Sequence, residues 1–224
     1  MKVFIFGHSS LEIPILAYRK VPSTAPVHRV LVLGGVHGDE VEGVALAHAL
    51  IGQLLTSPLN RIELTVVPEF NIDGILNKTR GNSNGVDLNR NLPTSDWSPI
   101  ATTARYQPGP KPLSEIENRS LVDFIERELP TFIFSLHSWK PLLNINDPPR
   151  SSLCQNVAAR IASFTGDPIE PTIGYSTPGC LGTYAGLERR IPTLTYEIER
   201  GLNLETVIKK HLNPLLEGLK VLET

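Results

Sequence analysis

The chain has 224 residues, of which 41% are hydrophobic, so it can bury a sizeable core within one domain spanning residues 1–224. Lys and Arg number 21 against 23 Asp and Glu, and the net charge of -2 leaves no broad basic surface for nucleic acid. No run of about 18 apolar residues could span a bilayer, and the N-terminus lacks the features of a signal peptide. We therefore expect a cytoplasmic protein that acts on a peptide or small molecule, without membrane or nucleic-acid partners.

The two cysteines, Cys154 and Cys180, are too few to suggest a disulfide framework. Reduced thiols fit the cytoplasmic compartment. Composition and charge set no expectation for the oligomeric state.

Short apolar, β-branched runs alternate with stretches of helical periodicity, which predicts an α/β fold with a largely parallel or mixed sheet. The predicted strands are Val3–Phe6, Ile15–Tyr18, Val30–Leu33, Leu64–Pro68, Phe132–Leu136 and Thr193–Ile198. The predicted helices are Glu40–Leu55, Ser114–Glu128, Ser152–Phe164 and Glu205–Leu222. In the second helix, Ser114 and Glu117 have the spacing of an N-terminal capping box.

Residues 71–112 have almost no hydrophobic periodicity and are rich in Asn, Gly, Pro and Asp. This composition predicts either a long ordered loop or a partly disordered one. A loop of this length inside a compact domain is usually functional or disordered. The residues that this loop carries favour a function.

Two histidines and a glutamate follow apolar runs that predict strands. His37 and Glu40 have the spacing His-x-x-Glu, and His137 directly follows another predicted strand. Open α/β sheets bind ligands at the carboxyl ends of their strands, so we expect these side chains to meet at one edge. Two imidazoles and one carboxylate are typical of a catalytic zinc with its fourth position free for water. The competing carboxylate is Asp39, which could ligate the metal or accept a hydrogen bond from a ligand imidazole.

Residues 78–91 combine two arginines, Arg80 and Arg90, with several asparagines and glycines. A guanidinium presents a planar fork that matches a carboxylate, and amide donors add orientation. This combination predicts a substrate with a free carboxylate. The structural alternative is that Arg90 pairs with Asp87 while the asparagines satisfy backbone groups in turns.

The last predicted strand carries Glu197 and Glu199 on one face. A carboxylate beside a metal-activated water is the usual general base, because it accepts the proton as water attacks and returns it to the leaving amine. Period-2 alternation does not separate the two glutamates, and a solvated strand face is the alternative for both.

In their order along the chain, these residues resemble the zinc carboxypeptidase family, and within it most closely the bacterial murein tripeptide amidases. The resemblance covers Gly34 to Glu197 and rests on these motifs: His37-x-x-Glu40, Arg80, Asp87-Leu88-Asn89-Arg90-Asn91, His137 and Glu197. It implies the fold of that family, a single α/β domain whose mixed, largely parallel sheet is flanked by helices on both faces.

The resemblance also implies a role for each residue of the candidate site. The ligands of one zinc ion per chain are then His37, Glu40 and His137. Arg80 would polarise the scissile carbonyl and stabilise the oxyanion, and Asn89 with Arg90 would bind the terminal carboxylate of the substrate. The family's Thr-x-Glu pattern assigns the general base to Glu197 rather than Glu199.

Two loops resemble those of the murein amidases in particular. Ser176–Thr183 contains a Thr-Pro-Gly sequence, and Tyr106–Glu115 is a Pro-rich segment ahead of a Ser-Glu helix start. Tyr175 stands at the distance before Glu197 at which the family places a tyrosine that closes over the substrate. Tyr184 is the weaker alternative for that role, and a packing role suits it as well.

The resemblance implies zinc-dependent hydrolysis of the amide bond before a C-terminal amino acid, with Glu197 as base and with zinc and Arg80 at the oxyanion. The substrate most similar to those of the murein amidases is γ-D-glutamyl-diaminopimelate, which would place the chain in peptidoglycan recycling, while an ordinary α-peptide remains the other possibility. An N-acyl amino acid deacylase similar to aspartoacylase or succinylglutamate desuccinylase is the alternative, because it shares several of the motifs. A non-catalytic binding protein is disfavoured by the presence of Glu197 and Arg80.

We expect Cys180, in the Thr-Pro-Gly loop, to pack as a small hydrophobic residue rather than to bind metal.

Overall fold

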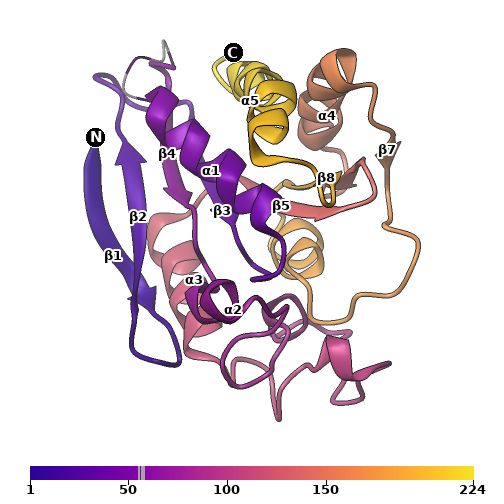
Figure 1. Cartoon of the computed structure of the whole chain (residues 1–224). Coiled ribbons are helices and arrows are strands. Elements are labelled where there is room, and N and C mark those ends of the chain that lie inside the picture. Colours follow the sequence, from indigo (N-terminus) through magenta and orange to yellow (C-terminus); the bar gives the residue numbers. More distant parts are fainter. Residues whose placement is uncertain (55, 57–58) are drawn as a thin grey trace.

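The computed structural model describes residues 1–54, 56 and 59–224. Within them, one sheet of eight strands has the order β1-β2-β4-β3-β5-β8-β6-β7 (Figure 1). The strands are β1 (Lys2–His8), β2 (Pro14–Lys20), β3 (His28–Gly34), β4 (Ile62–Val67), β5 (Phe132–Trp139), β6 (Leu142–Asn146), β7 (Ile169–Glu170) and β8 (Thr193–Glu199). Strands β4, β3, β5 and β8 run parallel at the centre, and β1, β2 and β6 pair antiparallel with their neighbours or with the central strands. The predicted mixed, largely parallel sheet is confirmed.

Helices cover both faces of the sheet (Figure 1). The α-helices are α1 (Val41–Leu54), α2 (Ile72–Asn77), α3 (Ile116–Glu128), α4 (Leu153–Thr165) and α5 (Leu204–Val221). Short helical segments are η1 (Leu88–Arg90), η2 (Ala104–Tyr106) and the π-helical η3 (Gly182–Glu188). Helices α1, α4 and α5 pack on one face, and α3 with η3 packs on the other.

The central strands are buried on both faces, and alternate residues of each strand therefore enter different cores. In β3, Val30 and Val32 contribute to the core under α1, α4 and α5, whereas Leu31 and Leu33 contribute to the core under α3. This period-2 division explains why the central strands read as continuous apolar runs. The two cores together hold the central strand ends, and with them the site, in fixed positions.

All six predicted strands and all four long helices are present, with ends that differ by a few residues. Leu55, the predicted end of the first helix, lies outside the described residues. The predicted capping box at α3 is wrong, because Glu115 rather than Ser114 is the N-cap residue. The Glu117 carboxylate instead accepts hydrogen bonds from the backbone N–H and hydroxyl of Ser10 at 3.0 and 3.1 Å.

The polar stretch at residues 71–112 is an ordered loop region that contains α2, η1 and η2. Asparagine side chains hold it together. The Nδ2 atom of Asn91 donates to the carbonyl of Pro108 at 2.7 Å and to the carbonyl of Lys111 at 3.0 Å. The partly disordered alternative is therefore wrong. Among the described helices, none is long and apolar enough to cross a membrane.

Candidate active site

Three central strands deliver the candidate residues to one edge of the sheet. The loop that joins β3 to α1 carries His37 and Glu40, while His137 and Glu197 lie near the carboxyl ends of β5 and β8. The register of β5 and β8 pairs His137 directly with Glu197. The β3–α1 loop also passes so close to α2 that a Cβ atom at Gly38 would overlap the backbone there, so only glycine fits at this position. The topology therefore brings together residues that are 160 positions apart in the chain, because parallel strands end at a common edge.

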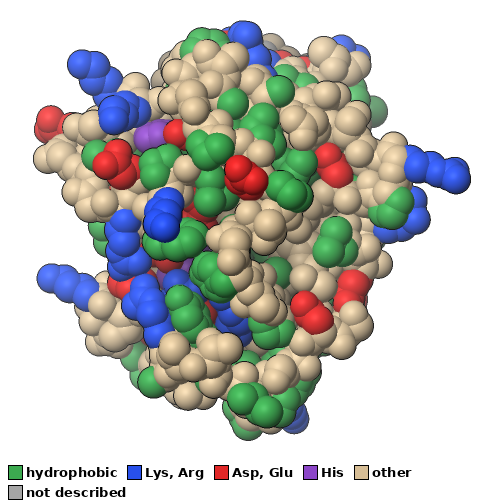
Figure 2. Space-filling view, turned by 90° about the vertical axis from the view of Figure 1, so that its right-hand side faces the viewer, with side chains coloured by type: hydrophobic (Ala, Val, Ile, Leu, Met, Phe, Trp, Pro, Cys, Tyr) green, Lys and Arg blue, Asp and Glu red, His purple; other side chains and the backbone are tan. Residues whose placement is uncertain are grey.

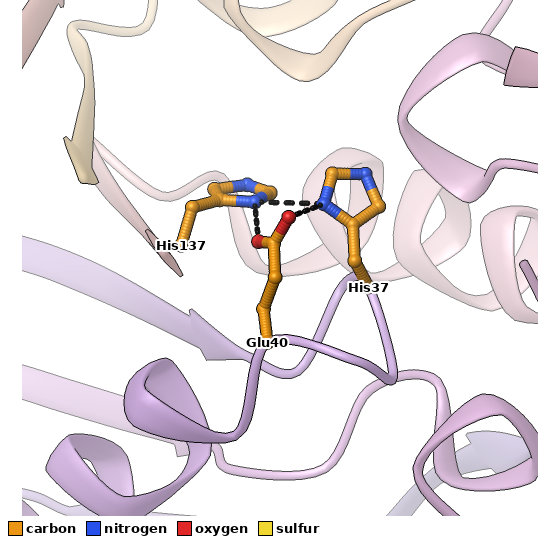
Figure 3. A group of neighbouring side chains, drawn as sticks. All are labelled: His37, Glu40 and His137. Atoms are coloured by element: carbon orange, nitrogen blue, oxygen red, sulfur yellow. Dashed lines mark hydrogen bonds and ion pairs between the residues drawn. The ribbon is translucent and has the colours of Figure 1, made fainter. Parts of the chain in front are cut away.

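His37, Glu40 and His137 converge on one point in the interior (Figure 3). The Nδ1 atoms of the two imidazoles lie 3.1 Å apart, and each lies within 2.9 Å of a different Glu40 carboxylate oxygen. All three side chains are buried, and their donor atoms lie within 4.8 Å of one another. Burial does not prevent ionisation of Glu40, because the two histidines hold the pKa of its carboxyl well below the usual range.

The outer nitrogen of each imidazole has its own hydrogen-bond partner. His37 Nε2 lies 3.1 Å from Asp87 Oδ1, and His137 Nε2 lies 2.9 Å from Ser135 Oγ. Asp87 is a carboxylate acceptor, so it fixes the proton of His37 on Nε2 and leaves the Nδ1 lone pair directed inward. Two imidazole lone pairs and a carboxylate at these separations repel one another unless a cation lies between them. The donor set thus fits zinc, which takes nitrogen and oxygen ligands of this kind.

Glu197 lies beside this group and is 7% exposed. Its Oε2 atom is buried and has no hydrogen-bond partner among the described residues. Burial, together with the nearby Glu40 carboxylate, raises the pKa of Glu197 to about 7, although His137 and Arg80 act in the opposite direction. A buried carboxyl group with a free oxygen and a pKa near neutrality has the properties of a general base.

The pH dependence of hydrolysis follows from this raised pKa. Glu197 accepts a proton only when it is ionised, so kcat/KM is expected to fall as the pH drops through its pKa. A bound divalent cation favours the carboxylate form, which places this acidic limb between the ordinary value of 4.5 and about 7. A pH profile of kcat/KM for the metal-loaded protein measures the limb. An acidic limb above that range, or a flat profile through it, would contradict the assignment.

Two arginines line the same cavity, and they differ in whether a carboxylate pairs with them. Arg80 Nε donates to Asp87 Oδ2 at 2.8 Å, and Arg80 Nη1 donates to Glu40 Oε1 at 3.2 Å. These carboxylates outweigh burial and raise the pKa of Arg80. Arg90 is 4% exposed and forms no ion pair with any residue that the structure describes. Its Nη1 donates a hydrogen bond to the backbone carbonyl of Asn89 at 2.7 Å.

The structural alternative, in which Arg90 pairs with Asp87, is wrong on this point, because Asp87 pairs instead with His37 and Arg80. The other half of that structural alternative is correct in part. Asn82 Oδ1 accepts hydrogen bonds from two backbone N–H groups of its own turn, those of Asn84 and Val86, at 3.1 Å each.

The candidate residues line a common cavity of about 340 Å³. They are His37, Glu40, Arg80, Asn89, Arg90, His137, Tyr175 and Glu197. Asn89 is fixed in place because its Oδ1 accepts the backbone N–H of Leu181 at 2.8 Å. Tyr175 is 40% exposed at the rim, and its ring lies against Trp139 and Tyr106.

The remaining candidates have other surroundings. Cys180 is buried in the cavity wall with two threonines within hydrogen-bond distance of its sulfur, and it is not part of the metal-ligating group. Tyr184 is fully buried beneath Arg189, which fits a packing role. Glu199 is exposed. Asp39 pairs with two arginines instead of a ligand imidazole.

Sequence reasoning missed the roles of three residues in and around the site. Asp87 and Ser135 orient the histidines, and Tyr106 lies with its ring centre 5.0 Å from the Arg80 guanidinium and 5.3 Å from that of Arg90. The need of every ligand imidazole for an outer partner would have pointed to an acidic residue such as Asp87. The sequence carries no comparable signal for Tyr106, whose position depends on the course of the long loop.

Comparisons with known proteins agree with this geometry. A family model described as zinc carboxypeptidase matches residues 1–163. Murein peptide amidase A of Vibrio campbellii is 31% identical over 227 residues, which cover 96% of this chain and 86% of that protein. The protein of the same name from Escherichia coli strain K12 is 32% identical over 80% of this chain and 74% of its own length. The crystal structure of murein-tripeptide amidase MpaA from Escherichia coli O157 aligns with all of this chain and 92% of that one, with a TM-score of 0.80 and 26% identity.

Proposed function

The chain belongs to the zinc carboxypeptidase family, whose members are hydrolytic metallopeptidases, and from this premise we propose that it hydrolyses the amide bond before the C-terminal diamino acid of a short murein peptide. The proposed substrate is γ-D-glutamyl-diaminopimelate within a tripeptide, and the whole chain acts as one catalytic domain. A place in peptidoglycan recycling and a cytoplasmic location remain predictions from the sequence. Relatives named for murein peptides support the substrate class.

The observation that carries the proposal is the unpaired guanidinium of Arg90 in the wall of the cavity. A buried cation without a counter-ion among the described side chains is costly unless an anionic group of a ligand approaches it. The C-terminal carboxylate of a peptide is such a group, and it matches the guanidinium fork. Asn89 lies beside Arg90 on the cavity wall and orients the same group.

The chemistry divides among four elements of the site. One zinc ion, held by His37, Glu40 and His137, would polarise the scissile carbonyl and make water acidic enough to attack at neutral pH. Glu197 accepts the proton of the attacking water on its free carboxylate oxygen and passes it to the leaving amine. Arg80 stabilises the negative charge that develops on the carbonyl oxygen. Tyr175 covers the bound peptide from the rim.

Replacing Arg80 with Ala is expected to lower kcat by about a hundredfold or more, because a positioned oxyanion donor contributes on the order of 3 to 4 kcal/mol to the transition state. KM should change less, since the developing charge is absent from the ground state. Steady-state kinetics on the tripeptide measure both constants. Arg80 also contacts Glu40, so zinc content must be measured in parallel. A variant that keeps its zinc and changes only KM would contradict this role.

Replacing Arg90 with Ala is expected to act in the opposite way, raising KM by about tenfold or more with a smaller effect on kcat. A charge-assisted hydrogen bond to the substrate carboxylate is worth roughly 1.5 to 3 kcal/mol, and it forms in the ground state as well as in the transition state. Arg90→Lys is the matched variant, because it keeps the charge but loses the fork. The assignment fails if a peptide amidated at its C-terminus is cleaved as well as the free acid by the wild-type protein.

The substrate class is tested by release of free diaminopimelate from L-Ala-γ-D-Glu-diaminopimelate by the zinc-loaded protein. N-acetyl-aspartate and N-succinyl-glutamate are assayed in parallel. We expect cleavage of the tripeptide and little or no deacylation. Deacylation without cleavage of any peptide would instead indicate an N-acyl amino acid deacylase.

A further inference from the structure

Two further arginines, Arg105 and Arg200, line the cavity and have no role in the chemistry described above. Arg105 lies in η2 and Arg200 directly follows β8. Both guanidinium groups contact one carboxylate oxygen, Oδ2 of Asp39, through Nη2 at 2.8 Å. We refer to Arg105, Asp39 and Arg200 together as the arginine clasp. Basic side chains also gather on one side of the face seen in Figure 2.

The clasp carries one more positive charge than negative. Arg105 and Arg200 keep about two fifths of their side-chain surface exposed, at 44% and 38%, whereas Asp39 is 15% exposed. Arg200 makes its second side-chain contact to the backbone carbonyl of Asp39, again through Nη2, at 3.0 Å. The Nε and Nη1 groups of both arginines therefore remain available as donors, as far as the described residues go. Arg80 differs, because two carboxylates already engage it.

Two residues of the clasp, Asp39 and Arg200, lie on the same chain segments as the candidate active-site residues. Asp39 directly precedes the candidate ligand Glu40 in the chain, and Arg200 follows the candidate base Glu197 by three positions. The backbone N–H of Arg200 donates to the carbonyl of Trp139 at the end of β5, at 3.0 Å. Arg90 belongs to η1, on a different segment of the cavity wall. The cavity thus has two separate groups that can bind anions, Arg90 and the clasp. The clasp is the one whose residues lie close in the chain to the candidate metal ligand Glu40 and the candidate base Glu197.

A γ-linked glutamyl residue supplies the anion that this arrangement fits. When glutamate is joined through its side-chain carbonyl, its α-carboxylate stays free on the acyl side of the scissile amide, separated from that amide by the two side-chain methylenes and Cα. A peptide with an uncharged residue before the scissile amide has no anion in that part of the molecule. With the C-terminal carboxylate on Arg90 and the scissile carbonyl beside Arg80, the acyl side must occupy another part of the same cavity, and the clasp, on the segments of Glu40 and Glu197, offers an anion-binding group there.

We propose that the arginine clasp binds the free α-carboxylate of a γ-linked glutamyl residue on the acyl side of the scissile bond, and thereby selects substrates that carry this carboxylate over peptides that lack it. This inference rests on the proposed function and names the part of the cavity that would recognise the carboxylate on the acyl side. Arg105 and Arg200 are binding residues in this account and take no part in proton transfer.

The experiment compares two tripeptides that differ at one group, L-Ala-γ-D-Glu-diaminopimelate and the analogue whose glutamyl α-carboxylate is a carboxamide. The measured quantity is the ratio of their kcat/KM values, in the wild-type protein and in Arg105→Gln and Arg200→Gln. Titration calorimetry with Glu197→Gln measures the affinities for the two tripeptides, and their ratio separates binding from turnover. Arg29→Gln is the matched control, because Arg29 is an exposed arginine at the opposite end of β3.

We expect the wild-type protein to prefer the carboxylate by about tenfold, the size of a charge-assisted hydrogen bond at a partly exposed site. The preference should fall toward one in both clasp variants and persist in Arg29→Gln. Arg105→Gln is the more decisive variant, because the side chain of Arg105 is exposed and its polar contact is to Asp39. Its loss should leave the fold intact, which circular dichroism checks.

Three results would overturn the inference. If the wild-type protein cleaves both tripeptides equally, the proposed function stands and the clasp has no part in recognising the substrate carboxylate. If the preference exists but survives in both variants, another group binds the carboxylate. If neither tripeptide is cleaved and neither binds in the calorimeter, the inference fails together with the proposed function.

Discussion

Replacing Glu197 with Gln is expected to lower kcat for tripeptide hydrolysis by about a hundredfold to ten-thousandfold, which is the usual contribution of general acid–base catalysis. The substituted amide has nearly the same shape as the carboxyl group but cannot accept the proton of the attacking water. Because the buried Oε2 atom has no partner among the described residues, the substitution removes no hydrogen bond of that oxygen. Zinc binding and peptide affinity should therefore be retained.

The control for this experiment is Glu199→Gln, which makes the same chemical change two residues further along β8. Glu199 is exposed and is not among the residues that line the cavity. Steady-state kinetics and zinc analysis of both variants separate the two glutamates that strand periodicity alone leaves equivalent. Loss of turnover in Glu199→Gln with normal turnover in Glu197→Gln would reverse the assignment.

Replacing His137 with Ala is expected to weaken zinc binding by more than about a hundredfold, since even the outer partners of metal ligands contribute up to that factor. Removing one of three protein ligands leaves a carboxylate and one imidazole. Hydrolysis should fall to background at any zinc concentration that saturates the wild-type protein. Zinc content by mass spectrometry and kcat/KM on the tripeptide measure the two effects.

A second readout guards against a general loss of stability in this buried position. Zinc should raise the Tm of the wild-type protein, because a ligand that binds the folded state stabilises it, whereas the Tm of His137→Ala should not respond. His48→Ala is the matched control, as His48 is an exposed histidine on α1 paired with Glu69. A zinc-dependent rise in Tm in His137→Ala equal to that of the wild type would place the metal elsewhere.

The strands and long helices could be predicted because the burial of their side chains determines which of their residues are apolar. Continuous apolar runs such as Val30–Leu33 have few alternatives in a domain of this size. The strand β6, with the sequence Leu-Leu-Asn-Ile-Asn, was missed because its two asparagines resemble a loop. Those asparagines line the cavity, which is the position where a local pattern is expected to break. The short α2 and two-residue β7 fall below the length at which periodicity can be recognised.

The candidate metal ligands could be predicted because few residues are both of a metal-binding type and placed just after a predicted strand. His37 and His137 each follow an apolar run, and parallel topology brings such positions to one edge. The charge pairing around them could not be predicted. Asp87 could have served either Arg90 or a histidine, and the choice depends on how the long loop folds back over the sheet. The clasp on Asp39 depends likewise on η2, which carries no sequence signal of its own.

The central claim is that one zinc ion, held by His37, Glu40 and His137, enables the chain to release the terminal diamino acid of a murein tripeptide. The most direct measurement titrates metal-free protein with zinc and follows diaminopimelate release from L-Ala-γ-D-Glu-diaminopimelate. The account predicts no release without metal and a rate that rises to a plateau at one zinc per chain. Release by the metal-free protein, or no release at any zinc concentration, would contradict it.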